Sequence, residues 1–263
     1  MKMNVNRLQE GLRTKRFGRN IVFLREVGST NDLAKELAGY GAIEGTVVVA
    51  ETQTCGRGRL DREWVSPKGG LWFSVILRTE LKPAEAVVLV FVSGLAVAEV
   101  LRELYGLKAE TKWPNDVLVN GRKVCGILTE MNTTGEKVNY AIVGVGVNVN
   151  FDVAKVFPEE SRKVATSLEN MLGRKVRLEE LFRALLEKLE NVYELFIREG
   201  FDSILAGWKK YAGFLGCQVE VASGTEKWIG LALDVENNGA LILRLEDGTV
   251  KHVFVGDATL QSK

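Results

Sequence analysis

Histidine and cysteine are scarce in this chain of 263 residues, and their scarcity excludes several kinds of active site. The one histidine, His252, argues against a histidine-based catalytic triad and against a metal site with several histidines. The three cysteines, Cys55, Cys125 and Cys217, lie far apart without a CxxC spacing. This pattern argues against a disulfide framework or a zinc site and favours a reducing compartment. The chemistry of this chain must therefore depend on lysine, arginine, carboxylates and backbone groups.

Charge of one sign and long apolar runs are also lacking. The 35 basic and 34 acidic side chains nearly cancel, so no global field indicates binding to nucleic acid or to an anionic membrane. The first residues, MKMNVNRLQE, have no apolar core and no small-residue cleavage site, so they do not resemble a signal peptide. No apolar run is expected to reach the roughly 20 residues that span a bilayer. We therefore expect a globular protein of the cytoplasm.

Periodicity and turn residues divide the chain into two parts. The first part predicts a mixed sheet with flanking helices, an α+β arrangement. Its expected strands are residues 21–27, 47–51, 71–77, 109–112, 123–131 and 140–149, and its expected helices are residues 29–38, 83–105 and 178–211. In the second helix Val87, Phe91, Leu95, Ala98 and Leu101 should share one side. From Cys217 the chain alternates with period two between SGTE, NNG and EDG turns, which predicts a small antiparallel β-barrel. We expect a catalytic domain over residues 1–214 and a β-barrel domain over residues 215–263.

The stretch ETQTCGRGRLDREWVSPKGG, residues 51–70, combines glycine, proline and arginine after a buried strand. Glycine lets backbone N–H groups approach an anion closely, and Arg57 and Arg59 carry forked donors suited to phosphate or carboxylate. Trp64 can stack on a planar base. A flexible surface loop with solvated arginines is the alternative.

The segment KWPND, residues 112–116, places a lysine, an amide and a carboxylate around one turn. Lys112 can neutralise a phosphate, and Asp116 can hold Mg²⁺ or orient a cation. The alternative is a β-turn in which Asn115 and Asp116 serve only turn chemistry.

Two further segments place polar or small residues on strands. Lys123 enters an apolar strand in which Gly126 permits close approach of a ligand, although an edge-strand lysine that prevents aggregation is the alternative. Gly144 and Gly146 bare one face of the next strand, and Asn148 on the same face can contact adenine. Close packing of this strand on a helix is the other explanation.

In combination these segments resemble the biotin protein ligase family. The motifs that carry the resemblance are STN at 29–31, Q-x-x-GRGR at 53–59, W-x-SP at 64–67, KWPND at 112–116, GRK-x-x-GIL at 121–128 and G-x-G-x-N at 144–148. The joint presence of GRGR and KWPND is the specific part. The resemblance implies a mixed sheet similar to class II aminoacyl-tRNA synthetases, followed by a small SH3-like barrel.

The resemblance also implies a role for individual residues. Binding of the biotin ureido ring falls to Ser29, Thr30, Asn31 and Gln53, and the loop Gly56, Arg57, Gly58 and Arg59 covers biotin and the adenylate. Lys123 is expected at the biotin carboxylate and the adenylate phosphate, with Gly126 beside biotin. Adenine is expected to contact Trp64 and Asn148. We add Lys112 and Asn115 to the adenylate site.

The implied reaction joins biotin to AMP from ATP with Mg²⁺, and then transfers biotin to a lysine of a biotin carboxyl carrier domain. Lys123, Lys112, Arg59 and Asp116 are the expected catalytic residues, and Asp116 is the expected Mg²⁺ ligand. Only about 20 residues precede the first expected strand, too few for the DNA-binding winged helix of some members. We therefore expect a monofunctional enzyme, a homodimer as is common among such relatives, without a nucleic-acid or membrane partner. Asp61 stands where many bacterial members carry glycine.

Two other functions remain open. A lipoate or octanoate ligase would share ancestry and chemistry, but is not expected to combine GRGR with KWPND. A non-enzymatic module that binds nucleic acid or peptide through the barrel and the Arg-Gly loop would belong to a different class. The near-neutral charge of the chain disfavours it.

Overall fold

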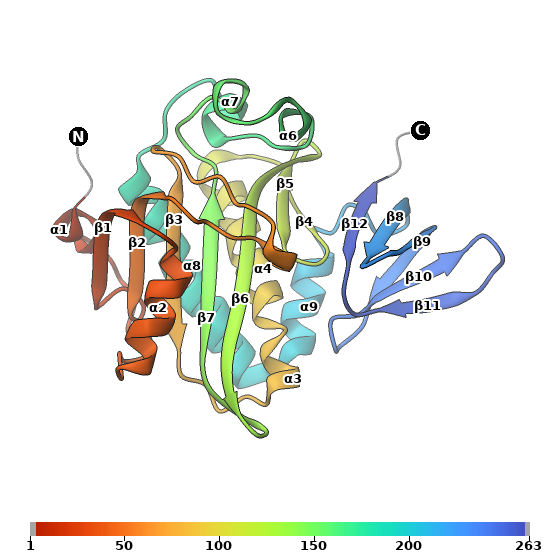
Figure 1. Ribbon diagram of the computed structural model, residues 1–263, viewed down its shortest axis with the longest axis horizontal. Helices are drawn as coiled ribbons and strands as arrows, with labels where there is room; N and C mark the ends of the chain where they lie inside the picture. The colour runs from red at the N-terminus through yellow and green to blue at the C-terminus, as the bar shows by residue number, and fades with distance from the viewer. Residues whose placement is uncertain (1–3, 261–263) are drawn as a thin grey trace.

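The computed structural model describes residues 4–260, apart from the side chain of Asp61, which lies outside the described atoms. Its largest element is a seven-stranded mixed sheet in the order β1-β2-β3-β7-β6-β5-β4 (Figure 1). β1 and β2 are parallel, and the other neighbouring pairs are antiparallel. The strands are β1 (Ile21–Val27), β2 (Val47–Gln53), β3 (Leu71–Leu77), β4 (Ala109–Lys112), β5 (Asp116–Val119), β6 (Arg122–Thr134) and β7 (Lys137–Val147). The expected α+β fold with a mixed sheet is confirmed.

Helices cover the two faces of this sheet unequally. One face packs against three helices, α4 (Leu89–Tyr105), α8 (Leu178–Glu199) and α9 (Phe201–Lys209), whereas α2 (Thr30–Gly39) covers part of the other face (Figure 1). The shorter helices are α1 (Val5–Gln9), α3 (Pro83–Ala86), α5 (Val153–Val156), α6 (Glu159–Val164) and α7 (Leu168–Leu172), with a 3₁₀ turn η1 (Arg59–Asp61). Part of the second face is thus left for other contacts.

Alternation along the strands decides which residues reach which face. Val47, Val49, Val75 and Val143 belong to the large core under α4 and α8, whereas Val48, Ile76 and Ile142 pack with Ala34 and Ala38 of α2. Because side chains alternate with period two, Ser74, Gly144 and Gly146 fall on the α2 face. That face, beyond the end of α2, is where polar residues and glycines replace the apolar ones.

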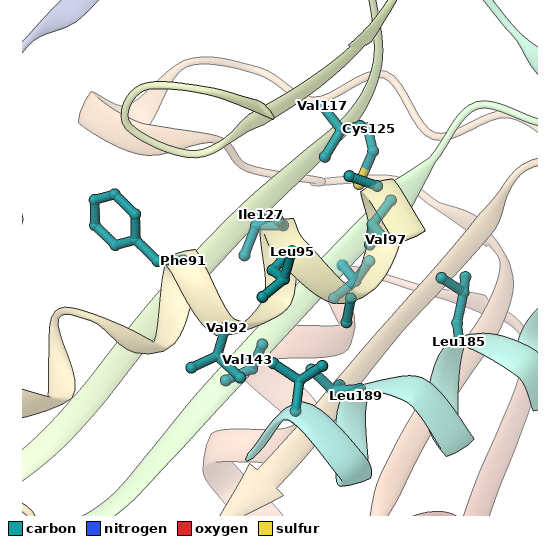
Figure 2. Close-up of a cluster of buried hydrophobic side chains, with 14 of the residues drawn as sticks. Phe91, Val92, Leu95, Val97, Val117, Cys125, Ile127, Val143, Leu185 and Leu189 are labelled. Carbon is teal, nitrogen blue, oxygen red and sulfur yellow. The ribbon is translucent and has the colours of Figure 1, made fainter. Parts of the chain in front are cut away.

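The core between the sheet and its covered face is built around α4. Figure 2 shows Leu95 of this helix beside Ile127 of β6, and Val92 near Val143 of β7, within one cluster of buried side chains. Burial of each such side chain contributes about 1.5–3 kcal/mol. The helix ends at Gly106, whose φ of 64° suits a residue without a Cβ.

One apolar stretch, Pro83–Tyr105, is long and apolar enough to cross a membrane by length and composition alone. The expectation that no apolar run approaches such a length was therefore wrong. Within this stretch, 72% of the 18-residue apolar window is buried inside the protein, as in the core helix of a globular protein.

Several expected elements differ in detail. The helix expected over residues 83–105 is divided into α3 and α4, and Val87 at the division is 49% exposed rather than on the buried side. The helix expected over residues 178–211 is broken at Gly200, which has a φ of 80° and an N–H bonded to the carbonyl of Phe196. Strand β5 was not foreseen because four residues after a turn show no clear period.

The C-terminal residues form a separate five-stranded antiparallel sheet in the order β11-β10-β9-β8-β12, to the right of the large sheet in Figure 1. Its strands are β8 (Gln218–Ser223), β9 (Glu226–Val235), β10 (Leu241–Leu245), β11 (Val250–Val253) and β12 (Asp257–Leu260). Several contacts join it to the first part, among them a hydrogen bond from the indole N–H of Trp113 to the carbonyl of Gly239 and an ion pair between Lys209 and Asp234. The antiparallel strands expected after Cys217 are present, and β12 is an additional strand.

Candidate active site

A cavity of about 380 Å³ lies on the α2 face of the large sheet. Its walls come from the start of α2, the end of β2, the following loop, the central strands β3, β6 and β7, and α6 with the residues beside it. This is the region that α2 leaves uncovered, so the sequence motifs that looked separate along the chain meet here.

One part of the cavity wall is an uncharged hydrogen-bond network. The side-chain carbonyl of Gln53 accepts from both the backbone N–H and the hydroxyl of Thr30, at 2.8 and 3.0 Å. The amide of Gln53 donates to Ser66, and Ser74 is within 2.8 Å of the Thr30 hydroxyl. Ser29 caps α2 by accepting from the N–H of Asp32. These groups suit a neutral ligand that both donates and accepts hydrogen bonds.

Asn31 connects this network to the sheet. Its amide donates to Glu130 at 2.7 Å and to the carbonyl of Leu128, and its carbonyl accepts from Ser74 at 2.6 Å. The amide also lies against Gly144, where any Cβ would overlap it. Close packing on a helix thus explains Gly144, the alternative considered for the glycine-bearing strand.

The Arg-Gly loop is an ordered hairpin over the cavity rather than a free loop. Backbone hydrogen bonds pair Gln53 with Ser66, Gly56 with Trp64, and Gly58 with Arg62. At Gly56 a Cβ would meet the carbonyl of Trp64 and the hydroxyl of Ser66, which explains the glycine. We refer to residues 54–66 as the lid hairpin.

Arginines attach the lid hairpin on two sides. The guanidinium of Arg57 pairs with the carboxylate of Asp32 on α2 through both of its terminal nitrogens. Arg59 donates to the carbonyl of Gly256 at 3.0 Å and lies 3.5 Å from Asp257, which also pairs with Arg62. The C-terminal sheet therefore supplies a carboxylate to the cavity wall, about 200 residues along the chain from the hairpin.

Trp64 lies on the face of the sheet that the glycines leave bare. A Cβ at Gly126 would be 2.9 Å from its ring, and a Cβ at Gly146 would be 2.6 Å from its Nε1. The ring is edge-on to Trp72 and lies 5.0 Å below the ammonium of Lys123. Gly126 and Gly146 thus keep space for a flat group in the cavity, which the indole fills here.

Lys123 brings positive charge to the cavity, and its ammonium group forms an ion pair with Asp116, which lies outside the cavity lining. Its Nζ is 2.6 Å from Oδ1 of Asp116, and Lys112 lies 3.9 Å from the other oxygen of that carboxylate. Burial lowers the pKa of Lys112; the nearby carboxylate of Asp116 opposes this shift, and the positive charge of Lys123 adds to it. Burial likewise lowers the pKa of Arg59. The arrangement concentrates cations where an anion would offset their desolvation.

Two asparagine side chains at or near the cavity also donate hydrogen bonds to backbone carbonyls. The amide of Asn115 donates to the carbonyl of Ile127 at 2.8 Å. The amide of Asn148 donates to the carbonyl of Thr166, while its side-chain carbonyl is buried without a partner, as is the N–H of Trp64. Buried polar atoms without a partner are rare in proteins, so both atoms suit a ligand that supplies one.

The structure brings most of the expected site residues together. Those that line the cavity are Ser29, Thr30, Asn31, Gln53, Arg57, Gly58, Arg59, Trp64, Asn115, Lys123 and Gly126. Gly56, Lys112, Asp116 and Asn148 lie just outside the lining. Ser74, Glu130 and Asp257 were missed: period-two counting from Gly126 places Glu130 on the same face, but no local pattern indicates Asp257.

A family model described as the Biotin/lipoate A/B protein ligase family matches residues 24–148. A biotin–[acetyl-CoA-carboxylase] ligase of Paracoccus denitrificans is 36% identical over 225 residues, which cover 84% of this chain and 92% of that protein. This chain belongs to the biotin protein ligase family. The bifunctional ligase/repressor BirA of Bacillus subtilis is 35% identical, over 98% of this chain and 79% of that protein. Among solved structures, the biotin protein ligase of Aquifex aeolicus in complex with biotin and ATP has a TM-score of 0.78 and 31% identity, covering 93% of this chain and all of that one.

Proposed function

We propose that this chain is a biotin protein ligase. It activates biotin with ATP to biotinyl-5′-AMP and pyrophosphate, then transfers biotin to one lysine of a biotin carboxyl carrier domain with release of AMP. The proposal depends on one observation: the same cavity is lined by an uncharged hydrogen-bond network around Thr30 and Gln53 and by the cationic side chains of Lys123 and Arg59. The names of the relatives support it.

The uncharged network suits the ureido ring of biotin. That ring is neutral, with two N–H donors and one carbonyl acceptor, and Ser29, Thr30, Asn31 and Gln53 present neutral groups of both kinds. Charged residues at this place would lose hydration on binding without gaining an opposite charge. The valeryl chain of biotin would then run past Gly126 toward Lys123.

The first chemical step joins two anions, the biotin carboxylate and the α-phosphate of ATP, and expels pyrophosphate. Lys123 and Arg59 line the cavity, and Lys112 lies behind them across Asp116. Each charge that is better placed for the transition state than for the substrates lowers the barrier by about 2–4 kcal/mol. Trp64 and Asn148 would hold adenine, the latter through its unpartnered carbonyl, and Asn115 would face the adenylate.

In the second step the amine of the carrier lysine attacks the mixed anhydride, and AMP leaves. Asp116 is the carboxylate next to Lys123, and we assign to it the orientation of that ammonium group and acceptance of the proton from the attacking amine. The lid hairpin, with Gly56 to Arg59, excludes water from the anhydride until the carrier arrives.

Mg²⁺ would be bound chiefly by the phosphates of ATP. No group of three or more histidine, cysteine, aspartate or glutamate side chains that could hold a metal occurs among residues 4–260. A single carboxylate such as Asp116 fits an ion that takes most of its ligands from a nucleotide and water.

The finer architecture is part of the same proposal. A catalytic domain over residues 1–214, similar to class II aminoacyl-tRNA synthetases, would precede an SH3-like barrel over residues 215–263. The boundary is supported by the connection between the end of α9 at Lys209 and the start of β8 at Gln218, which contains no helix or strand. We also propose a cytoplasmic homodimer that acts on the carrier protein.

Exchange of labelled pyrophosphate into ATP tests the function directly. We expect exchange with biotin and none with lipoate or octanoate. Exchange with lipoate or octanoate instead would identify a lipoate-type ligase. No exchange with any acid, in folded protein with Mg²⁺, would refute the adenylation mechanism, and steeply salt-dependent binding to nucleic acid would then support a binding module.

A further inference from the structure

Four charged side chains connect the lid hairpin to the body of the sheet. Arg57 of the hairpin pairs with Asp32 on α2 and lies 3.7 Å from Glu130 on β6. Lys35, one turn along α2, lies 3.0 Å from Asp32 and 2.8 Å from Glu130. The cluster holds two carboxylates and two cations, so its own charges balance.

The cluster continues into the wall of the cavity. The second oxygen of Glu130 accepts from the amide of Asn31 at 2.7 Å, and Asn31 accepts in turn from Ser74. A continuous set of polar contacts therefore runs from the expected ureido site to the arginine of the lid. None of the roles assigned above involves Asp32, Lys35 or Glu130.

We propose that Asp32 is a positioning residue of the ligase: it holds Arg57 and thereby keeps the lid hairpin closed over the acyl-adenylate. The proposal rests on the proposed function, because retention of an adenylate presupposes that one is formed. Asp32 does not line the cavity, whereas Arg57 does. The effect on the ligand is therefore exerted through the arginine.

The geometry supports an anchor rather than a casual surface pair. Two parallel bonds between a guanidinium and a carboxylate fix the orientation of both groups, unlike a single contact. The carboxylate is carried in the first turn of α2, whose N-terminus is capped by Ser29, so the anchor has a rigid base. The lid is attached at its other side to Asp257, so loss of the Asp32 contact would free one side only.

We expect loss of the Asp32 contact to change how long the adenylate stays bound, and not the rate at which it is formed. A partly exposed ion pair contributes little to stability, so its loss should open the lid only about three- to fivefold more often. Release of bound adenylate should accelerate by a similar factor in Asp32→Asn. The single-turnover rate of adenylate formation should stay within about twofold, because Asp32 does not touch the reacting groups.

The experiment compares wild type with Asp32→Asn, Asp32→Glu and the control Asp202→Asn. Asp202 is another exposed carboxylate in the first turn of a helix, α9, so its loss changes the helix end without changing the lid. Each protein is loaded with labelled biotin and ATP, freed of excess substrate, and followed for release of labelled biotinyl-AMP. In parallel, the unliganded proteins are treated with trypsin, and cleavage after Arg57, Arg59 and Arg62 is timed.

We expect faster release and faster lid cleavage in Asp32→Asn, wild-type behaviour in Asp202→Asn, and partial rescue in Asp32→Glu. Equal release from wild type and Asp32→Asn would overturn the proposal, as would an equal increase in Asp202→Asn. A wild-type chain that forms no adenylate would overturn the proposed function and the retention role with it. The trypsin comparison, which needs no ligand, would then still decide whether Asp32 anchors the lid.

Discussion

Two neighbouring glycines of β7 provide a sharp test of the site, because their surroundings differ. At Gly144 a Cβ would overlap the buried amide of Asn31, which hydrogen bonds to three other residues. At Gly146 the three atoms nearest to a Cβ all belong to the indole of Trp64, at the end of a side chain carried by the lid hairpin. Alanine should therefore damage the fold at the first position and the ligand site at the second.

The magnitudes follow from these contacts. In Gly144→Ala, overpacking costs about 1–3 kcal/mol and strain in one hydrogen bond of the Asn31 amide about 1 kcal/mol, together about 3 kcal/mol. For a chain of this size that lowers Tm by about 6–12 °C. In Gly146→Ala the indole, 2.6 Å from the new Cβ, must retreat by about 1 Å to reach an ordinary contact of roughly 3.5 Å. The stability cost should stay below about 1 kcal/mol, but a flat ligand loses its place on the sheet.

Thermal unfolding and biotin-dependent pyrophosphate exchange separate the two effects. We expect kcat/KM for exchange to fall about ten- to hundredfold in Gly146→Ala, with Tm within about 3 °C of wild type. Wild-type exchange kinetics in Gly146→Ala would refute the placement of the ligand on this glycine. An unchanged Tm in Gly144→Ala would refute the packing explanation for its neighbour.

Three further outcomes are expected. Addition of biotin and ATP should change tryptophan fluorescence in wild type but not in Trp64→Phe, since the indole must move or become covered; an equal change in both would contradict this. Lys123→Met should slow pyrophosphate exchange about 10²–10³-fold with unaltered circular dichroism, and a loss below threefold would argue against its role. The hydrogen bond from Arg57 holds the pKa of Asp32 at about 2, below its ordinary 3.8. The stabilisation from this carboxylate is therefore complete above about pH 4 and lost as pH falls toward 2, so the stability difference between wild type and Asp32→Asn in urea should narrow over that range rather than widen.

The sequence by itself was sufficient for most strands, for α2, for the antiparallel strands that follow Cys217, and for the motifs that meet in the cavity. These features depend on local rules: period-two alternation, capping residues before α2, of which the structure uses Ser29, and turn residues between strands. The period-two alternation of side chains also showed that Gly126, Gly144 and Gly146 lie on strands with one bare face. It could not show what covers that face.

Only the tertiary structure decided how the glycine-bearing face is used. Gly144 meets α2, whereas Gly126 and Gly146 meet Trp64 from the lid. The break at Gly200, the exposure of Val87 and the contribution of Asp257 to the cavity were likewise invisible in the sequence. The physical reason is the same in each case. Local pattern determines which way a side chain points, but the residue it meets depends on elements that are distant in the chain and are brought together only by packing.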